Sequence, residues 1–252
     1  MIHLESLTFG YGKTVLFDKL DLKLPAGSIG GLLGLNGAGK TSLLKLIAGA
    51  LLPQAGSMQV FGRNPARREA EHLAAVAFVP EDPWVPAQKP EAWLATQLPF
   101  RPAFDRALFD QLRRDFALTE DKPLSKLSYG QRKKFCLAFA LASGANTLLL
   151  DEPTNGLDIP AKVTFRKMLA AAAREDRVIL VSTHQVRDLE NLIDPVLIMD
   201  QGKIPFVLPV TDLATELQAQ GLGDLEALFN TALTEPGRLA ALVGAIQGVA
   251  HA

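Results

Sequence analysis

The stretch Gly34-Leu35-Asn36-Gly37-Ala38-Gly39-Lys40-Thr41 decides the fold of this chain. A triphosphate needs a concave row of backbone N–H donors, and the three glycines let the chain bend around it without Cβ atoms in the way. The apolar run 28–33 before the loop predicts a buried strand. The run 42–47 after it predicts a helix whose positive N-terminus faces the anion. This order of strand, loop and helix is that of a P-loop.

Within the loop, Lys40 is expected to reach the β- and γ-phosphates, and the hydroxyl of Thr41 is expected to bind Mg²⁺. A glycine-rich turn that matches by chance is the alternative, and the flanking strand and helix argue against it. The expected nucleotide contacts in this segment are Gly34, Asn36, Gly37, Ala38, Gly39, Lys40, Thr41 and Ser42.

Length and composition set the class of protein. With 252 residues the chain amounts to one large domain, or to one domain with a small appendage. A net charge of −1 gives no basic field for a nucleic-acid partner. The single cysteine, Cys136, cannot form an internal disulfide and reads as a small buried hydrophobe. No signal peptide pattern opens the chain, and the apolar stretch 239–250 is too short to span a bilayer, so we expect a membrane role only through a partner.

The order of elements predicts an α/β fold. Residues 2–9 and 20–24 alternate apolar with polar, which predicts two antiparallel strands joined through a turn at 10–12. Prolines between 80 and 125 leave only short helical pieces such as 106–116. A helix at 131–143, a strand at 147–150, a helix at 161–174 and a strand at 177–182 then alternate, as in a parallel sheet with crossover helices. The tail 213–251 predicts two or three short helices.

A second anion site is predicted at Leu127-Ser128-Tyr129-Gly130-Gln131, where a serine and a glycine stand at the start of the helix 131–143. In isolation this pattern is more often a simple N-cap. Two phosphate sites for one nucleotide favour two subunits that share it.

A third cluster, Thr147-Leu148-Leu149-Leu150-Asp151-Glu152-Pro153, is an apolar strand that ends in two carboxylates. Ligands of parallel sheets bind at the carboxyl edge of the strands, where Asp151 can hold Mg²⁺ through water. A solvated acidic pair in a turn is the alternative reading.

These motifs, in this order, resemble the nucleotide-binding subunits of the ATP-binding cassette (ABC) family, whose signature reads Leu-Ser-Gly-Gly-Gln. The resemblance covers about residues 2–204. It implies a P-loop ATPase core with a mainly parallel sheet and helices, an N-terminal antiparallel β subdomain and a small α-helical signature subdomain. It places the ATPase domain at 1–204, with the helical subdomain at about 82–143, and a C-terminal helical tail at 205–252.

The resemblance also implies roles for single residues. Glu152 would orient or deprotonate the water that attacks the γ-phosphate, a task that needs a carboxylate within hydrogen-bond reach of that water. Ser128 and Gly130 would contact the γ-phosphate held by the opposite protomer.

Three further positions match the family less specifically. His184, at the end of the strand 178–183, is similar to the switch histidine that donates to a γ-phosphate oxygen. Tyr11 matches the aromatic residue on which adenine stacks, and a tyrosine that anchors a turn is the alternative. Asp158, in Thr154-Asn155-Gly156-Leu157-Asp158, would shape the dimer interface near the P-loop, and an ordinary turn is the alternative.

The chain departs from the family at two positions. Glu81 stands where the family usually has a glutamine that contacts Mg²⁺ and the attacking water, and it adds negative charge there. Tyr129 replaces the first glycine of the signature. Its side chain fits only if the backbone there is not left-handed, and we expect its ring to cover the ribose of the opposite nucleotide.

The resemblance therefore implies an ATPase subunit of a membrane transporter of the exporter or multidrug type. Two copies, or this chain and a second ABC subunit, would close on two ATP molecules with Mg²⁺ and drive a separate transmembrane permease from the cytoplasmic face of the membrane. The segment 82–100, with Trp84, Trp93 and Phe100, is the candidate dock for that partner, and packing within the helical subdomain is the alternative. Other readings are a soluble ABC ATPase outside transport and an ATP-binding regulator with little turnover. The expected catalytic residues are Glu152, His184, Lys40 and Glu81, and the expected metal ligands are Thr41, Glu81 and Asp151.

Overall fold

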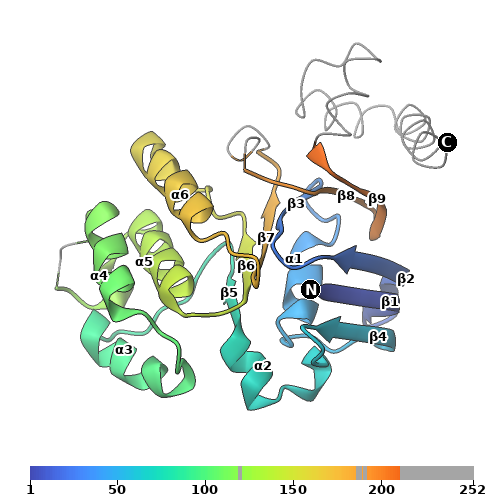
Figure 1. The fold of residues 1–252 in the computed structure, drawn as a ribbon, viewed down its shortest axis with the longest axis horizontal. Helices are drawn as coiled ribbons and strands as arrows, with labels where there is room; N and C mark the ends of the chain where they lie inside the picture. The colour runs from blue at the N-terminus through green and yellow to red at the C-terminus, as the bar shows by residue number, and fades with distance from the viewer. Residues whose placement is uncertain (119–120, 186–188, 190–191, 211–252) are drawn as a thin grey trace, which may run out of the picture.

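The computed structural model of the chain describes residues 1–118, 121–185, 189 and 192–210. Its strands form two sheets, one antiparallel and one mainly parallel, and helices lie between and beside them (Figure 1). This mixed α/β architecture is the one that the sequence predicts. The predicted tail helices at 213–251 lie outside the described residues. In the part of the chain that is described, no helix combines the length and the apolar composition needed to cross a bilayer.

The antiparallel sheet consists of β1 (Ile2–Tyr11), β2 (Thr14–Leu24) and β4 (Ala55–Val60), with β1 in the middle. The predicted pairing of the first two strands is confirmed, although both are longer than expected. The turn falls at 12–13, because Gly10 and Tyr11 still belong to β1. β4 was not predicted, since only two of its six residues are buried and its apolar pattern is short.

The second sheet carries the predicted alternation of strands and helices. Its spatial order is β5 (Val76–Val79), β6 (Thr147–Asp151), β7 (Val178–Thr183), β3 (Ile29–Leu33), β8 (Val196–Asp200) and β9 (Lys203–Leu208). The first five strands are parallel, so their carboxyl ends lie along one edge, and β9 closes the other side antiparallel to β8. The predicted boundary at residue 204 lies within β9, and the sheet continues to Leu208.

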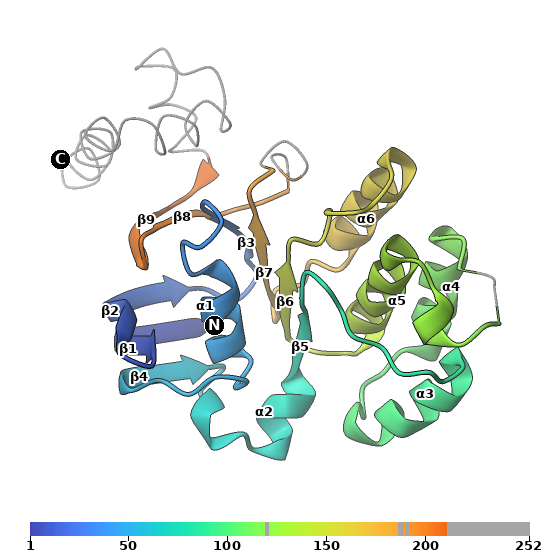
Figure 2. The same ribbon diagram turned by 180° about the vertical axis from the view of Figure 1, so that it is seen from behind.

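Helices cover both faces of this sheet, as the views from front and back show (Figures 1 and 2). The helices are α1 (Lys40–Ile47), α2 (Ala70–Ala75), α3 (Pro90–Gln97), α4 (Arg106–Asp115), α5 (Tyr129–Ala142) and α6 (Ile159–Ala171). The period of two along a strand divides the apolar side chains between two cores. In β6, Leu148 and Leu150 pack in a cluster with α4, α5 and α6, whereas Leu149 packs with α1 and the antiparallel sheet.

The helices α3, α4 and α5 form a lobe of their own, which we call the helical lobe (Figure 2). Its core is aromatic: the ring of Trp93 lies 5.4 Å from that of Phe135 and 4.7 Å from that of Phe139, both edge to face. Trp93 thus belongs to the packing of the lobe, which was the alternative reading for this residue. Nη1 of Arg101, just after α3, lies within 3.0 Å of the carbonyl oxygens of Leu73, Ala74 and Val76 and so attaches the lobe to the start of β5.

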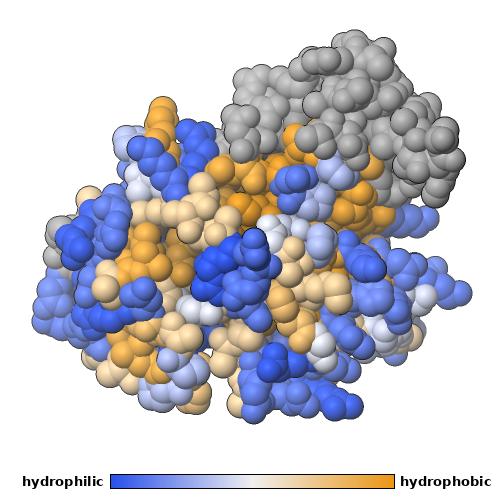
Figure 3. Space-filling view, in the orientation of Figure 1, coloured by the Kyte–Doolittle hydropathy of each residue, from blue (hydrophilic) through white to orange (hydrophobic). Residues whose placement is uncertain are grey.

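The surface in the orientation of Figure 1 is hydrophilic along the outer margins of the helical lobe and of the antiparallel sheet, and between them apolar regions surround a hydrophilic patch near the centre (Figure 3). A few large apolar side chains are strongly exposed among the described residues. They include Trp84 with 82% and Phe100 with 71% of the side chain accessible, both in the segment that the sequence predicts as a dock.

The substitution Phe109→Ala should lower the free energy of unfolding by about 3–5 kcal/mol, because the ring is fully buried between Phe104 and Phe135 and its loss leaves a cavity. Chemical denaturation measures the change. The matched control is Phe100→Ala, at an exposed ring, which should change stability by less than about 0.5 kcal/mol. Equal losses in the two variants would contradict this description of the lobe.

Candidate nucleotide-binding site

The P-loop joins the end of β3 to the start of α1, as predicted, and its glycines are required by contacts and by conformation. A Cβ on Gly34 would lie 2.5 Å from the carbonyl oxygen of Met199 in β8. Gly39 has a φ of +114° and directly precedes α1, so the helix begins at Lys40 with its N-terminus open to the loop. The local sequence thus presents backbone N–H groups to an anion.

A cleft of about 460 Å³ opens over this loop. It is lined by Tyr11, Leu16, Leu35, Asn36, Gly37, Gly39, Lys40, Thr41, Ser42, Glu81, Asp151 and Glu152. The predicted residues outside this lining are Gly34, Ala38, Ser128, Gly130, Asp158 and His184. The structure therefore brings the P-loop, both strand-end carboxylates and Glu81 to one cleft, and it leaves the signature residues away from it.

Lys40 is buried at the floor of the cleft. Its ammonium donates to the carbonyl oxygens of Gly34 at 2.6 Å and Leu35 at 3.2 Å, and it lies 3.5 Å from Oε1 of Glu152. A positive charge thus stands beside the loop and faces a buried carboxylate, where a phosphate oxygen can replace the carbonyl acceptors.

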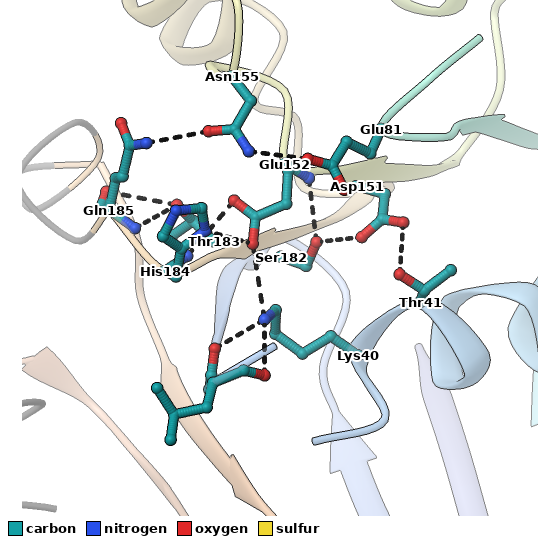
Figure 4. A network of polar contacts seen from close by, with 12 residues as sticks. Lys40, Thr41, Glu81, Asp151, Glu152, Asn155, Ser182, Thr183, His184 and Gln185 are labelled. Atoms are coloured by element: carbon teal, nitrogen blue, oxygen red, sulfur yellow. Dashed lines mark hydrogen bonds and ion pairs between the residues drawn. The ribbon is translucent and has the colours of Figure 1, made fainter. Parts of the chain in front are cut away.

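Asp151 ties the P-loop to the sheet. Its Oδ2 accepts a hydrogen bond from the hydroxyl of Thr41 at 2.7 Å, and its Oδ1 accepts one from Ser182 in β7 at 2.5 Å (Figure 4). Glu81 adds a carboxylate to the two strand-end carboxylates that line the cleft. A hydroxyl and carboxylates are the hard oxygen ligands that Mg²⁺ prefers, so the donor set fits this ion.

Glu152 lies between two potential cations at the edge of the sheet. Its Oε1 is 2.9 Å from Nδ1 of His184, which makes an ion pair when the imidazole is protonated, and Oε2 accepts from the backbone N–H of His184 at 3.4 Å (Figure 4). The backbone of Glu152 is left-handed, with φ of +44°, and strain of this kind concentrates at functional sites. The structure thus places the predicted switch histidine in contact with the strand-end glutamate, a pairing that the sequence did not predict.

Tyr11 stands at the other end of the cleft, half exposed. Its ring packs edge to face on Phe9, with 5.0 Å between centroids, and its hydroxyl lies 3.0 Å from Oγ of Ser42. The ring is exposed, so stacking of adenine on it stays a prediction, while the hydroxyl anchors the turn to the P-loop helix.

The signature forms the start of α5, which begins two residues earlier than expected. Ser128 is the N-cap: its hydroxyl accepts from the N–H of Gln131, whose side chain bonds back to the N–H of Ser128. This is a capping box, the structural role that the pattern also allowed. Gly130 is required by space, since a Cβ there would lie 2.8 Å from the carbonyl oxygen of Gly156.

The backbone of Tyr129 is helical, and its side chain contacts other residues of its own chain. Its hydroxyl donates to the carbonyl oxygen of Glu81 at 2.8 Å, and its ring lies against Gly156. The ring is therefore engaged within its own chain, whereas the sequence predicted that it would cover the ribose of a partner's nucleotide. The hydroxyl contact is possible because the loops of Glu81 and Gly156 both approach the start of α5.

Asp158 is the N-cap of α6, where Oδ1 accepts from the N–H of Ala161 at 2.8 Å. That hydrogen bond, with the ammonium of Lys134 at 3.3 Å, holds the pKa of the Asp158 carboxyl below its ordinary value. The sequence offered an ordinary turn as the alternative for this residue and did not predict the helix cap. A role at a dimer interface stays a prediction.

Four contributing residues were missed by sequence reasoning. Ser182 bonds Asp151, and Lys133 donates to the carbonyl oxygen of Glu152. Asn155 donates to Oε1 of Glu81 at 2.9 Å and accepts from Gln185 at 3.0 Å, so it bridges two loops (Figure 4). Asn155 lies in the same short motif as Asp158, and Gln185 directly follows His184, so their places in the sequence could have indicated them. Nothing in the sequence distinguishes Lys133 from its neighbours.

The comparisons with known proteins agree with this geometry. The family model described as ABC transporter matches residues 17–155. The bacitracin transport ATP-binding protein of Bacillus licheniformis is 30% identical and covers 84% of this chain and 71% of its own length. The lantibiotic transport ATP-binding protein of Streptococcus pyogenes is 26% identical and covers 91% of this chain and 96% of its own length. Import subunits of the family match as well.

A solved structure described as the ATP-binding subunit of an ABC transporter has the same fold, with a TM-score of 0.82 at 23% identity, covering 93% of this chain and all of that one. The fold, the P-loop cleft and these matches define an ATP-hydrolysing P-loop protein. The chain belongs to the ABC transporter family, as an ATP-binding subunit whose ATPase activity is coupled to transport.

Gly156 and Gly62 are both left-handed, but only Gly156 lies against the Tyr129 ring, so substitution of the two glycines tests that contact. A Cβ on Gly156 would lie 2.2 Å from the Tyr129 ring, whereas one on Gly62 meets nothing, although φ is +76° and +77° respectively. Gly156→Ala should therefore lower the free energy of unfolding by about 1–3 kcal/mol more than Gly62→Ala, as overpacking does. Chemical denaturation of both variants measures this difference, and equal losses would mean that the ring does not occupy this place.

Proposed function

We propose that this chain is the ATPase subunit of an exporter: it binds Mg-ATP in the P-loop cleft, closes as a dimer on two nucleotides, and drives a separate transmembrane partner. The observation that carries the hydrolytic part is the position of Glu152, a buried carboxylate 3.5 Å from the Lys40 ammonium and 2.9 Å from the His184 imidazole, at the rim of the cleft. Phosphoryl transfer to water requires groups of these kinds, and here both Lys40 and His184 lie within contact distance of the Glu152 carboxylate.

Binding of the triphosphate uses the loop and its helix. The backbone N–H groups of 36–41 surround the phosphates, and Lys40 exchanges the carbonyl oxygens of Gly34 and Leu35 for phosphate oxygens. Tyr11 offers its exposed ring face to the adenine. In this arrangement the protein neutralises the phosphates mainly with backbone dipoles and one ammonium.

Thr41, Asp151 and Glu81 would hold Mg²⁺, which when bound neutralises negative charge on the phosphate oxygens. Glu152 then orients the attacking water and accepts its proton, because it is the carboxylate of the cleft that is not among the expected Mg²⁺ ligands. His184, at the end of β7, donates to a γ-phosphate oxygen. Catalysis in this scheme consists of positioning and of fixed charges around an in-line displacement.

Dimerisation follows from the place of the signature. Ser128 is exposed at the N-terminus of a fourteen-residue helix, and neither it nor Gly130 lines the cleft of its own chain. The N-terminus of this helix is therefore available to a phosphate presented by a second protomer, with Asp158 near the interface. Whether the second protomer is a copy of this chain or another ABC subunit is an outcome of the experiment below.

Export through a transmembrane partner at the cytoplasmic face of the membrane is supported by the printed functions of the lantibiotic and bacitracin transport relatives. The dock that we propose is the surface of Trp84 and Phe100, beside a cavity of about 230 Å³ lined by Phe78, Pro83 and Arg101. Trp84 lies three residues after Glu81, so the segment that carries this surface continues from the loop that reaches the nucleotide cleft.

The substitution Glu152→Gln should lower the kcat of ATP hydrolysis by about 10²–10⁴, the contribution typical of a general base, while ATP binding is retained. The measurement is steady-state ATPase activity with Mg²⁺, together with binding of a fluorescent ATP analogue and size-exclusion chromatography in ATP. The matched control is Glu71→Gln, an exposed glutamate on α2, which should keep full activity. Unchanged turnover in Glu152→Gln would refute the assignment of the base. A wild-type chain that binds ATP without turnover, alone and with its partner, would favour the regulatory reading.

The substitution Trp84→Ala should weaken the binding free energy of the membrane subunit by about 2 kcal/mol, a typical loss for a central aromatic anchor. Less membrane subunit should therefore co-purify with the variant. Unfolding should be unaffected, because the side chain is 82% exposed. Leu52→Ala, at an apolar residue that is 57% exposed beyond α1, is the control and should leave capture unchanged. Trp93→Ala is unsuitable here, since it removes packing against Phe135 and Phe139. Undiminished capture by Trp84→Ala would rule out this surface as the dock.

A further inference from the structure

Lys133 is a buried charged side chain that the scheme above does not use. It lies on α5, four residues after Tyr129, and its side chain has no exposed surface. Its ammonium donates to the backbone carbonyl oxygen of Glu152 at 2.5 Å and to the hydroxyl of Tyr129 at 3.3 Å, and it lies 5.4 Å from the centre of the Tyr129 ring. Its partners are therefore neutral oxygens and an aromatic ring.

Holding an ammonium in this place is costly. Burial lowers the pKa of Lys133 to about 8, although the carboxylates of Glu81, Glu152, Asp151 and Asp82 all act to raise it. An apolar side chain of similar length would fill the same space without that cost. We therefore expect the Lys133 ammonium to be kept for its effect on the group that it contacts.

The group that it contacts is the backbone of Glu152, which is held from both sides. The N–H of Glu152 donates to the carbonyl and hydroxyl oxygens of Ser182, each at 3.1 Å. Its carbonyl accepts from Lys133 and, at 3.2 Å, from the N–H of Asn155. Because this residue is left-handed, the direction of its carboxylate depends on peptide groups that are fixed by these bonds.

The contacts of Lys133 extend to a third segment. Tyr129, which accepts from Lys133, donates its own hydroxyl hydrogen to the carbonyl oxygen of Glu81 at 2.8 Å. A continuous series of hydrogen bonds therefore runs from the Glu81 loop through the start of the signature helix to the peptide of Glu152. It joins the Glu81 loop, which leads to the proposed dock, to the residue that we propose as the base.

We propose that Lys133, acting with Tyr129, is a positioning residue that sets the direction of the Glu152 carboxylate and couples it to the signature helix and the Glu81 loop. This inference rests on the proposed function of Glu152 as the base. Neither side chain lines the nucleotide cleft, so their loss acts on turnover and leaves the affinity for ATP in place.

The test is steady-state ATPase kinetics of the full chain carrying Lys133→Met, which keeps the length of the side chain and removes its donors. We expect kcat to fall by about tenfold to hundredfold, as for a misplaced catalytic group, with KM for ATP within about twofold of wild type. Lys167→Met, the same exchange at an exposed position of α6, should change neither constant. A merely structural lysine would lower the melting temperature and leave kcat of the folded fraction unchanged, and that result would overturn the proposal.

Tyr129→Phe gives a second measurement if Lys133→Met does not fold, because it removes one hydroxyl and keeps the ring. It should lower kcat several-fold with KM unchanged, and the double variant should lose no more than Lys133→Met alone, since both act on one series of bonds. Wild-type kcat in folded Tyr129→Phe would overturn the coupling to the Glu81 loop. If Glu152→Gln is inactive while both of these variants turn over normally, only this inference fails; if Glu152→Gln is active, the proposed function fails first.

Discussion

The carboxylate of Asp151 is the point on which the arrangement of the site depends. It accepts one hydrogen bond from Thr41 in the P-loop helix and one from Ser182 in β7, so residues far apart in the chain meet at a single buried group. A buried carboxylate is stable only when its oxygens are hydrogen-bonded. These two bonds hold the end of β6, the end of β7 and the start of α1 together. The nucleotide cleft lies over the place where these elements meet.

The parallel order of the strands explains how this is achieved. β6 lies between β5 and β7, so the residues that follow these three strands, among them Glu81, Glu152 and His184, emerge at neighbouring places on one edge. Both faces of the same strands are packed, with alternate side chains in one core or the other. A sheet that is anchored from both sides can hold a left-handed residue such as Glu152 at its edge without relaxing it.

Much of this could be predicted from the sequence, because the P-loop, the strand-end carboxylates and the signature are local patterns with a defined chemistry. The P-loop residues and strand-end carboxylates of the cleft followed from these patterns, the antiparallel pair from the alternation in 2–9 and 20–24, and Tyr11 and Glu81 from the family resemblance. The rest depends on tertiary contacts that no local pattern contains. The direction of the Tyr129 ring is decided by the neighbouring Gly156, the burial of Trp93 by Phe135 and Phe139, and the bridge through Asn155 by two loops that meet only in the folded chain. β9 was missed because its pairing with β8 follows a short turn in a segment of weak periodicity.

The attachment of the helical lobe through Arg101 has a mechanical consequence. The carbonyl oxygens of Leu73, Ala74 and Val76, at the end of α2 and the start of β5, accept from one guanidinium nitrogen of Arg101. A displacement of the lobe that breaks these bonds would leave three carbonyl groups without this donor, so Arg101 fixes the entry of the lobe to the sheet. The signature helix belongs to that lobe and is held a second time by Tyr129 and Lys133, so the distance of Ser128 from the sheet is set by two attachments at opposite ends of the lobe's connection.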